Sequence, residues 1–454
     1  MFLYLGLLIL GSLGRAQPGP PAYPVKLSSD GLYLVDQEGR PFFTNGESAW
    51  SLIAQLSRED VEFYLENRRQ KGFNLVLANL VEHRFSTNAP GNFYGVQPFT
   101  TSGNFGTPNE AYFAHADWVL TKAAEKGLVV LLDPLYLGWE CGIDGWCAEV
   151  KASSFATMRS YGRYLGARYR SFPNIVWLVG GDTDPVANGV AEKVREFVEG
   201  VRENDTVHLF SAANAPEQAA VDPWPSEPWL NLNNIFTYVD AYPAALQQFN
   251  RLPFKPFFLL ETYYENEHSS TPLSLRRQAY WTVLSGGILG HIFGNCEIWG
   301  FSRGYCTGPW KPQLESAGSQ TLPLVGRLFT SRPFYQLVPD QTHQVLTSGY
   351  QSGSTYAATA RTTNGSTIIA YVPTQRAVTI DLTKVAGSSA KAWWFNPRSG
   401  TPTLVGTFPT SGPTVLMPPD QNDWVLVVDD ASLNLPAPGP FANPAPPSNL
   451  RIVR

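Results

Sequence analysis

Pro173-Asn-Ile-Val-Trp-Leu-Val-Gly-Gly-Asp-Thr-Asp-Pro185 contains the clearest strand end in this sequence. Its apolar run, residues 175–179, is long enough for one fully buried strand. Two glycines follow the run directly, and behind them come two carboxylates, Asp182 and Asp184. Asp is also a favoured helix cap, which better explains Asp184 before a proline at a helix start. Asp182, closer to the strand, is therefore the candidate for chemistry.

A second strand end of the same kind lies at residues 256–260. This apolar run ends on Glu261, which is followed by Tyr264 and Glu265. In a parallel α/β barrel, the carboxyl ends of the strands carry the chemistry. Two acids supplied by separate strands predict a general acid/base, Asp182, and a second carboxylate, Glu261. The sequence alone leaves open which carboxylate takes which role.

Helical and strand patterns alternate around these two runs. Helix stop signals, a lysine followed by glycine, occur at residues 71–72 and 126–127. No helix is predicted between the fifth and sixth strands, where residues 216–230 are proline-rich. A doubly wound sheet is disfavoured because no GxGxxG loop follows a strand. The pattern predicts an α/β fold, a (β/α)8 TIM barrel over residues 41–334. Its strands are expected at residues 42–43, 73–80, 128–133, 175–179, 207–210, 234–240, 256–260 and 291–293.

Other patterns flank the barrel. Residues 1–16 are typical of a secretion signal, with an apolar run and small residues at its end. Residues 17–40 predict a proline-rich spacer and an N-terminal β-hairpin. Short strands separated by turns predict a small all-β sandwich over residues 335–431. Residues 432–454 read as a proline-rich linker and the start of a further module.

Composition excludes several classes of function. The 454 residues are 43% hydrophobic, which supports large folded cores. The net charge is −5, and no Lys/Arg cluster indicates nucleic acid as a partner. No segment is long and apolar enough for a membrane span, so a secreted protein, extracellular or periplasmic, is expected. The 13 Trp and 20 Tyr suit a carbohydrate substrate, and the oligomeric state stays open.

The four cysteines fit an exported protein. Cys141 and Cys147 are six residues apart, and Cys296 and Cys306 are ten apart. Two local disulfides are the first choice among the three connectivities. Neither pair has CxxC spacing or an accompanying His cluster, so no metal site is expected and no cofactor is implied.

Further residues near predicted strand ends are candidates for substrate binding. The acids among them are as well explained by loop salt bridges, and the tryptophans by loop packing. The three histidines His83, His208 and His291 are interpreted as structural. The candidates are Glu47, Trp50, Glu82, Asp133, Trp139, Tyr242, Tyr264, Glu265 and Trp299.

Four motifs in order carry a resemblance to a known family. Residues 46–50, 177–182, 260–265 and 290–295 together resemble the apiosidase-like glycoside hydrolases. That family pairs such a barrel with a small β-domain that bears a collagen-binding label. The resemblance implies Asp182 as acid/base and a nucleophilic carboxylate on the seventh strand.

These observations predict a secreted glycoside hydrolase with a two-carboxylate, retaining mechanism. The expected substrate is a plant or microbial polysaccharide, with pectic side chains favoured by the resemblance. One alternative is a non-catalytic carbohydrate- or matrix-binding protein that uses its β-domain. Another is a glycosidase of different specificity, a furanosidase or an endo-glucanase.

Overall fold

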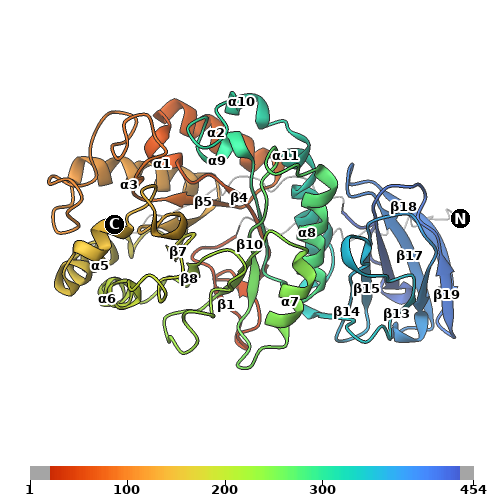
Figure 1. Cartoon of the computed structure of the whole chain (residues 1–454). Helices are drawn as coiled ribbons and strands as arrows, with labels where there is room; N and C mark the ends of the chain where they lie inside the picture. The colour runs from red at the N-terminus through yellow and green to blue at the C-terminus, as the bar shows by residue number, and fades with distance from the viewer. Residues whose placement is uncertain (1–20, 440–454) are drawn as a thin grey trace, which may run out of the picture.

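The computed structural model describes residues 21–439, and the predicted TIM barrel is confirmed (Figure 1). Eight parallel strands pair in the order β8-β7-β6-β5-β4-β11-β10-β9. The predicted secretion signal and the end of the C-terminal segment lie outside the described residues. The barrel strands are β4 (Thr44–Ser48), β5 (Leu75–Asn79), β6 (Val129–Asp133), β7 (Ile175–Gly180), β8 (Phe210–Ala213), β9 (Asn233–Phe236), β10 (Phe257–Glu261) and β11 (Gly290–Phe293).

The barrel closes between β8 and β9. The backbone amides of Asn231 and Leu232 both donate to the Phe210 carbonyl at 3.0 Å. The Asn234 side chain donates to the Ala212 carbonyl at 2.7 Å. These bonds occupy polar groups that an open sheet edge would leave without partners.

Helices cover the outside of the barrel (Figure 1). Ser57 accepts a hydrogen bond from the Asp60 amide and starts the first long helix, and Gly72 ends it with a left-handed φ of 95°. The predicted loop between β8 and β9 contains no helix. The longer helices are α2 (Arg58–Lys71), α3 (Glu110–Glu125), α5 (Phe155–Tyr169), α6 (Ala191–Arg202), α7 (Ala241–Phe249), α8 (Pro272–Leu284) and α12 (Pro323–Thr330). The shorter ones are α1 (Leu52–Gln55), α4 (Cys147–Ala152), α9 (Cys296–Trp299), α10 (Trp310–Gln313) and α11 (Ala317–Thr321).

Two predicted strands were misplaced. Phe42 belongs to the N-terminal hairpin, and the first barrel strand begins at Thr44. The predicted fifth strand at residues 207–210 is wrong by three residues, since β8 begins at Phe210. The cause is Asp205, whose carboxylate accepts from the amides of Val207 and His208 at 3.1 Å and turns the backbone there.

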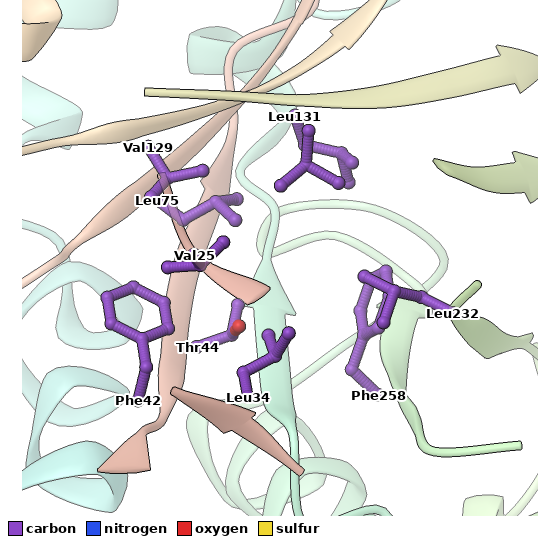
Figure 2. Close-up of a pocket in the computed structure, with 10 residues that line it drawn as sticks. Val25, Leu34, Phe42, Thr44, Leu75, Val129, Leu131, Leu232 and Phe258 are labelled. Carbon is purple, nitrogen blue, oxygen red and sulfur yellow. The ribbon is translucent and has the colours of Figure 1, made fainter. Parts of the chain in front are cut away.

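The N-terminal segment closes the bottom of the barrel. The strands β1 (Lys26–Leu27), β2 (Leu34–Val35) and β3 (Pro41–Phe42) form an antiparallel sheet, which confirms the predicted hairpin and adds a strand. Val25, Leu34 and Phe42 line an apolar cavity of about 10 Å³ against the first residues of the barrel strands (Figure 2). This cavity is at the end opposite the strand ends that carry the two candidate acids, so it is packing space.

The C-terminal region is the predicted all-β domain. A six-stranded sheet, in the order β12-β14-β15-β20-β17-β18, packs on a three-stranded sheet, β13-β16-β19. The strands are β12 (Leu337–Pro339), β13 (Leu346–Ser348), β14 (Thr359–Thr362), β15 (Thr367–Val372), β16 (Val378–Asp381), β17 (Ser389–Phe395), β18 (Pro402–Pro409), β19 (Pro413–Leu416) and β20 (Trp424–Asp430).

The larger sheet also packs against the barrel. The sheet lies beside α8 (Figure 1), and one apolar core contains Trp281 of α8 together with Tyr371 and Val427 of the sheet. Arg276 of α8 donates to both oxygens of Asp423, at 2.7 and 2.8 Å, and both side chains are buried. The two regions therefore share a core, and α8 is the element between them.

No helix within residues 21–439 is long and apolar enough to cross a membrane.

Candidate active site

Asp182 lies at the carboxyl end of β7 in a backbone conformation that its neighbours impose. Gly180 and Gly181 have φ values of 105° and 114°, and Asp182 itself has a left-handed φ of 53°. A Cβ at Gly180 would lie 2.3 Å from the Ala213 carbonyl oxygen, and one at Gly181 would lie 2.4 Å from the Tyr136 ring. Only glycine fits at these two positions, and the turn they allow directs Asp182 toward Tyr136.

The loop after β6 holds Asp182 in place. The Glu140 amide donates to the Asp182 carbonyl oxygen at 3.0 Å. Thr183 accepts from the Cys141 amide at 2.6 Å and donates its hydroxyl to the Gly138 carbonyl. The disulfide between Cys141 and Cys147, as predicted, closes this loop. The loop and the strand end are therefore fastened to each other at the backbone.

Glu261 is the last residue of β10, and its orientation depends on an irregularity in that strand. Pairing with β9 shifts register between Leu259 and Glu261. Leu260 packs inside the barrel, so regular alternation would send Glu261 outward. The phenols of Tyr264 and Tyr238 act to lower the pKa of the Glu261 carboxyl, although burial outweighs them. The register shift thus turns Glu261 toward these two phenols.

The two carboxyl groups oppose each other's ionisation. Burial raises the pKa of Asp182 to about 6, and nearby Asp144 adds to the rise, whereas the Tyr136 hydrogen bond lowers it. Burial also raises the pKa of Glu261 well above its ordinary value, and Asp182 is the next largest cause. The pair therefore retains a proton at pH values where isolated carboxyl groups are ionised.

Aromatic side chains surround the pair. Trp50 donates from Nε1 to the Tyr264 hydroxyl at 2.9 Å, and its ring lies 5.7 Å from that of Tyr136. The rings of Trp299 and Phe85 pack edge to face, with their centres 4.9 Å apart. All five rings belong to the core inside the barrel, so they form the border between that core and the mouth.

Two of the predicted substrate ligands are buried at strand ends. Glu82 accepts from the Ser51 hydroxyl at 2.8 Å and from the His83 amide at 3.0 Å, which fixes the loop after β5. Asp133 accepts from the Leu135 amide at 2.8 Å, and burial raises its pKa well above the ordinary value. Both carboxyls lie near the pair but are 0% exposed.

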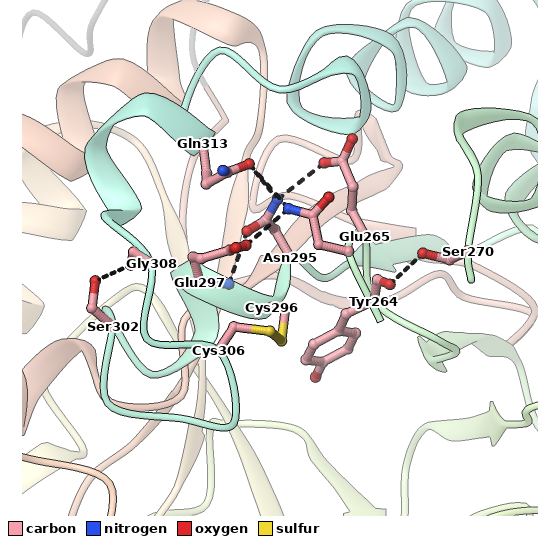
Figure 3. The surroundings of a disulfide bond; sticks show 11 residues. Tyr264, Glu265, Ser270, Asn295, Cys296, Glu297, Ser302, Cys306, Gly308 and Gln313 are labelled. Atoms are coloured by element: carbon pink, nitrogen blue, oxygen red, sulfur yellow. Dashed lines mark hydrogen bonds between the residues drawn. A yellow bond between two sulfur atoms is a disulfide. The ribbon is translucent and has the colours of Figure 1, made fainter. Parts of the chain in front are cut away.

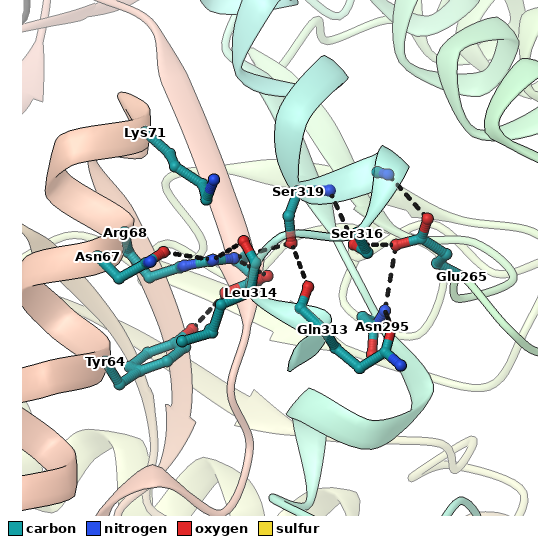
Figure 4. Close-up of polar contacts among 12 residues, drawn as sticks. Tyr64, Asn67, Arg68, Lys71, Glu265, Asn295, Gln313, Leu314, Ser316 and Ser319 are labelled. Atoms are coloured by element: carbon teal, nitrogen blue, oxygen red, sulfur yellow. Dashed lines mark hydrogen bonds and ion pairs between the residues drawn. The ribbon is translucent and has the colours of Figure 1, made fainter. Parts of the chain in front are cut away.

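Glu47 faces away from the mouth. Its carboxylate accepts from Arg68 at 2.7 Å and from the Tyr64 hydroxyl at 2.5 Å. These two donors lie on α2 (Figure 4), and all three side chains are fully buried between β4 and α2. Both Glu47 oxygens are thus held by side chains of an outer helix, so we withdraw Glu47 from the proposed ligands.

Glu265 holds the starts of α9 and α11 in place through hydrogen bonds. It accepts from the Ser316 hydroxyl at 2.5 Å, the Gly318 amide at 2.8 Å and the Asn295 side chain at 3.1 Å (Figure 4). These bonds occupy both carboxylate oxygens and tie the end of β10 to α9 and α11. We withdraw this residue as well.

Tyr242 contacts the β-domain. Its ring stacks on Tyr356 at 4.2 Å, and its hydroxyl accepts from the Gly353 amide at 3.1 Å. The side chain therefore lies between α7 and the all-β domain, apart from Asp182 and Glu261, and is also withdrawn.

The second predicted disulfide, Cys296–Cys306, is confirmed (Figure 3). The loop that it closes contains Trp299. Trp299 is only 6% exposed, whereas Trp139, on the other disulfide loop, is 44% exposed. Of the two tryptophans, Trp139 has the surface for sugar stacking.

Asp184 and two of the histidines have structural partners. Asp184 accepts from the amides of Val186 and Ala187 at 2.9 Å and caps the following turn, which lowers its pKa. His208 binds Asp205 at 2.7 Å, and His83 lies 3.3 Å from Glu149.

Several residues around the pair were not predicted from the sequence. They come from loops whose approach depends on the barrel, although Tyr136 follows the strand end at Asp133 closely enough to have been a candidate. These residues are Tyr136, Asp144, Tyr238, Glu267 and Tyr305. Within residues 21–439, no group of three or more His, Cys, Asp or Glu is arranged to hold a metal ion.

Two family models match the chain. Residues 28–336 match the family model "Apiosidase-like, catalytic domain", and residues 338–429 match "Putative collagen-binding domain of a collagenase". No curated protein is similar enough to count as a match.

Solved structures similar to the chain extend over both regions. One, titled a glycoside hydrolase, has 25% identity and a TM-score of 0.79, over 91% of this chain and 97% of its own. A family 5 glycoside hydrolase from Bacteroides vulgatus has 25% identity and a TM-score of 0.81, over 92% and 96%. A third structure, also a glycoside hydrolase by title and from the same organism, shares the fold at 16% identity, with a TM-score of 0.69 over 90% and 82%.

Proposed function

Because this chain belongs to the apiosidase-like family of glycoside hydrolases, we propose that it cleaves polysaccharide with Asp182 as acid/base and Glu261 as nucleophile. The observation that carries the proposal is the coupling of these two carboxyls. Burial raises both pKa values, and the charge of Asp182 raises that of Glu261 further, so the pair holds a proton available for transfer at near-neutral pH.

The first step forms a glycosyl ester. A Glu261 oxygen attacks the anomeric carbon while the bond from that carbon to the leaving oxygen breaks. Asp182 transfers its proton to the leaving oxygen, which departs as a hydroxyl group. Charge that develops on the sugar ring lies between two carboxyl groups, where it is stabilised.

The second step releases the sugar. Water attacks the anomeric carbon, and Asp182, now ionised, accepts the proton of that water. The ester bond to Glu261 breaks and the carboxylate is regenerated. The anomeric configuration is retained because two inversions occur at the same carbon.

The division of roles rests on the likeness of the four sequence motifs to the family. The phenols around the pair do not separate the two carboxyls, because Tyr136 lowers the pKa of Asp182 and Tyr264 and Tyr238 lower that of Glu261.

The charge at the mouth supports an uncharged glycosyl group as the substrate. Besides the pair itself, Asp144 raises the pKa of Asp182, and Glu267 raises that of Glu261. A uronate in this subsite would face these carboxylates, which costs energy where solvent is excluded. A neutral sugar on a pectic side chain fits both this charge and the family.

The two disulfides support an exported enzyme. Cys141–Cys147 and Cys296–Cys306 each close a loop at the mouth. Structural disulfides persist in oxidising compartments and are rare in the cytosol. We therefore place the enzyme outside the cytoplasm, in the extracellular medium or the periplasm.

Hydrolysis of pectic and other plant polysaccharides by the purified protein tests the proposal. Glu261→Ala should lose at least a thousand-fold of activity, and azide should restore turnover as a glycosyl azide, since the anion occupies the vacated site. Asp184→Asn is the matched control for Asp182→Asn and should stay active, because the partners of Asp184 are two turn amides and the Gln218 side chain. Unimpaired release of sugar by Glu261→Ala would reject the nucleophile assignment.

A further inference from the structure

We propose that Tyr305 and Trp139, one on each disulfide-closed loop, form a leaving-group subsite that stacks on the sugar ring beside the cleaved bond. This inference rests on the proposed function. It adds a second sugar position, with Tyr305 as a specificity-determining residue that the sequence motifs do not contain.

Tyr305 is a large aromatic side chain held in solvent at the edge of the site. It is 75% exposed, yet the centre of its ring lies 5.7 Å from that of Trp299 and 5.9 Å from that of Phe85. An apolar ring of this size normally gains free energy by burial, so the exposed face is available for a ligand.

The loop that carries Tyr305 is closely braced. Cys306 is bonded to Cys296, and the Ser302 hydroxyl donates to the Gly308 carbonyl at 2.6 Å (Figure 3). A Cβ at Gly304 would lie 2.2 Å from the Trp299 ring, so the backbone next to Tyr305 rests directly on that indole. The position of Tyr305 is therefore defined before any ligand binds, which lowers the entropy cost of stacking.

Trp139 occupies the corresponding place on the other loop. It is 44% exposed and lies two residues before Cys141. Its backbone amide donates to Asp144 at 3.3 Å, and the next amide, that of Glu140, donates to the Asp182 carbonyl. The backbone next to Trp139 is thus hydrogen-bonded to the backbone of the proposed acid.

The loop that carries Tyr305 reaches the acid through packed rings and backbone bonds. Trp299, on which Tyr305 packs, accepts a hydrogen bond at its carbonyl oxygen from the Ser51 amide at 3.0 Å. The ring of the adjacent Trp50 lies 5.7 Å from that of Tyr136, which donates to Asp182. In agreement with this geometry, partial burial of the hydroxyl raises the pKa of the Tyr305 phenol, and the charges of Asp144 and Asp182 raise it further.

This placement identifies which sugar the aromatics contact. The acid protonates the leaving oxygen, so groups beside Asp182 face the leaving sugar rather than the one transferred to Glu261. Aromatic faces pack against the C–H groups of a sugar ring and make no demand on a particular hydroxyl pattern. The proposed ligand is therefore a pyranose or furanose ring of the polysaccharide next to the cleaved residue.

The experiment compares two substrates of the sugar that the hydrolysis screen releases. One is the polysaccharide, and the other is the glycosyl fluoride of that sugar, whose leaving group is a fluoride ion. Tyr305→Ala should lower kcat/KM roughly ten-fold for the polysaccharide, because the apolar ring no longer covers the leaving sugar, and leave the fluoride unchanged. Tyr305→Trp should restore the polysaccharide rate. Tyr350→Ala, which removes a partly exposed ring of the β-domain, is the matched control and should behave as the wild type.

An equal loss on both substrates would overturn the subsite, since it would mean that Tyr305 supports the catalytic pair itself. Unchanged rates on both substrates would overturn it as well. A Trp139→Ala variant with the same selective loss would support it, and an unselective loss would remove Trp139 from it.

Binding without turnover separates this inference from the proposed function. Electrophoresis in gels that contain pectin, xylan or arabinogalactan measures retention of the Asp182→Asn variant. Weaker retention after adding Tyr305→Ala would support the subsite even if the wild type hydrolyses nothing, in which case only the proposed function fails. Retention that is absent, or that Tyr305→Ala leaves unchanged, would overturn the subsite while the hydrolysis data stand.

Discussion

The Tyr136 hydroxyl donates a 2.6 Å hydrogen bond to Oδ2 of Asp182. The two residues are 46 positions apart, and glycine at position 181 is what lets the Tyr136 ring lie against the backbone before Asp182. The bond lowers the pKa of a carboxyl that burial raises. Tyr136 therefore controls the pH range over which Asp182 holds its proton.

Replacement of Tyr136 by phenylalanine tests that control. Without the donor, the pKa of Asp182 should rise from about 6, by roughly one unit for a hydrogen bond worth about 1–1.5 kcal/mol. If Asp182 is the acid, the alkaline limb of the kcat/KM profile should move to higher pH. A limb that stays in place or moves to lower pH would contradict this prediction.

Asp182→Asn should stabilise the fold in a pH-dependent way. Asp182 has a raised pKa of about 6 in the folded protein, so its ionisation opposes folding as pH rises from its unfolded value toward and above 6. At pH 7.5 the variant should therefore have a free energy of unfolding about 1–3 kcal/mol higher than that of the wild type, and a higher melting temperature. Near pH 3 the difference should vanish, because the wild-type carboxyl is then largely protonated in both the folded and the unfolded state. A difference of equal size at both pH values would reject the prediction.

The Glu47–Arg68 pair should matter for stability and not for substrate affinity. Both side chains are fully buried, so Arg68→Met leaves an unpaired carboxylate and should cost about 3–5 kcal/mol in denaturant unfolding. The double variant Glu47→Gln with Arg68→Met should lose less, since no lone charge stays buried. Glu47→Gln alone should leave KM unchanged. A raised KM without loss of stability would return Glu47 to the substrate site.

The barrel and the β-domain should unfold together. Asp423 accepts both Arg276 bonds and one from the Tyr371 hydroxyl at 3.0 Å. Asp423→Ala should therefore destabilise the whole chain by about 3–5 kcal/mol and keep a single thermal transition. Separate transitions in calorimetry, with only one of them shifted, would show that the domains fold independently. Asp420→Ala is the control at a half-exposed carboxylate and should cost far less, because solvent reaches its bonds to Trp424 Nε1 at 2.7 Å and Arg398 at 3.3 Å.

The sequence predicted the barrel because its strands are local patterns. Residues 175–179 and 256–260 are apolar runs bounded by turn residues, and each run formed a strand: one ends on Glu261 and the other two residues before Asp182. The prediction failed at residues 207–210, where the apolar character of Val207 was outweighed by two backbone bonds to Asp205. Such a bond depends on where the Asp205 side chain turns, and periodicity carries no information on that.

The sequence by itself determined the alternation of strands and helices, the pairing of nearby cysteines and the two acids at the ends of β7 and β10. These features depend on residues close together in the chain, or on the one edge where parallel strands must end. Only the tertiary structure decided the direction of each polar side chain. Glu47 and Asp182 both lie near strand ends, but one faces the helices and the other the mouth, because side chains alternate along a strand and turns reset that alternation. The same holds for Tyr305, whose neighbour Trp299 is close in sequence but whose link to Asp182 exists only once the barrel has closed.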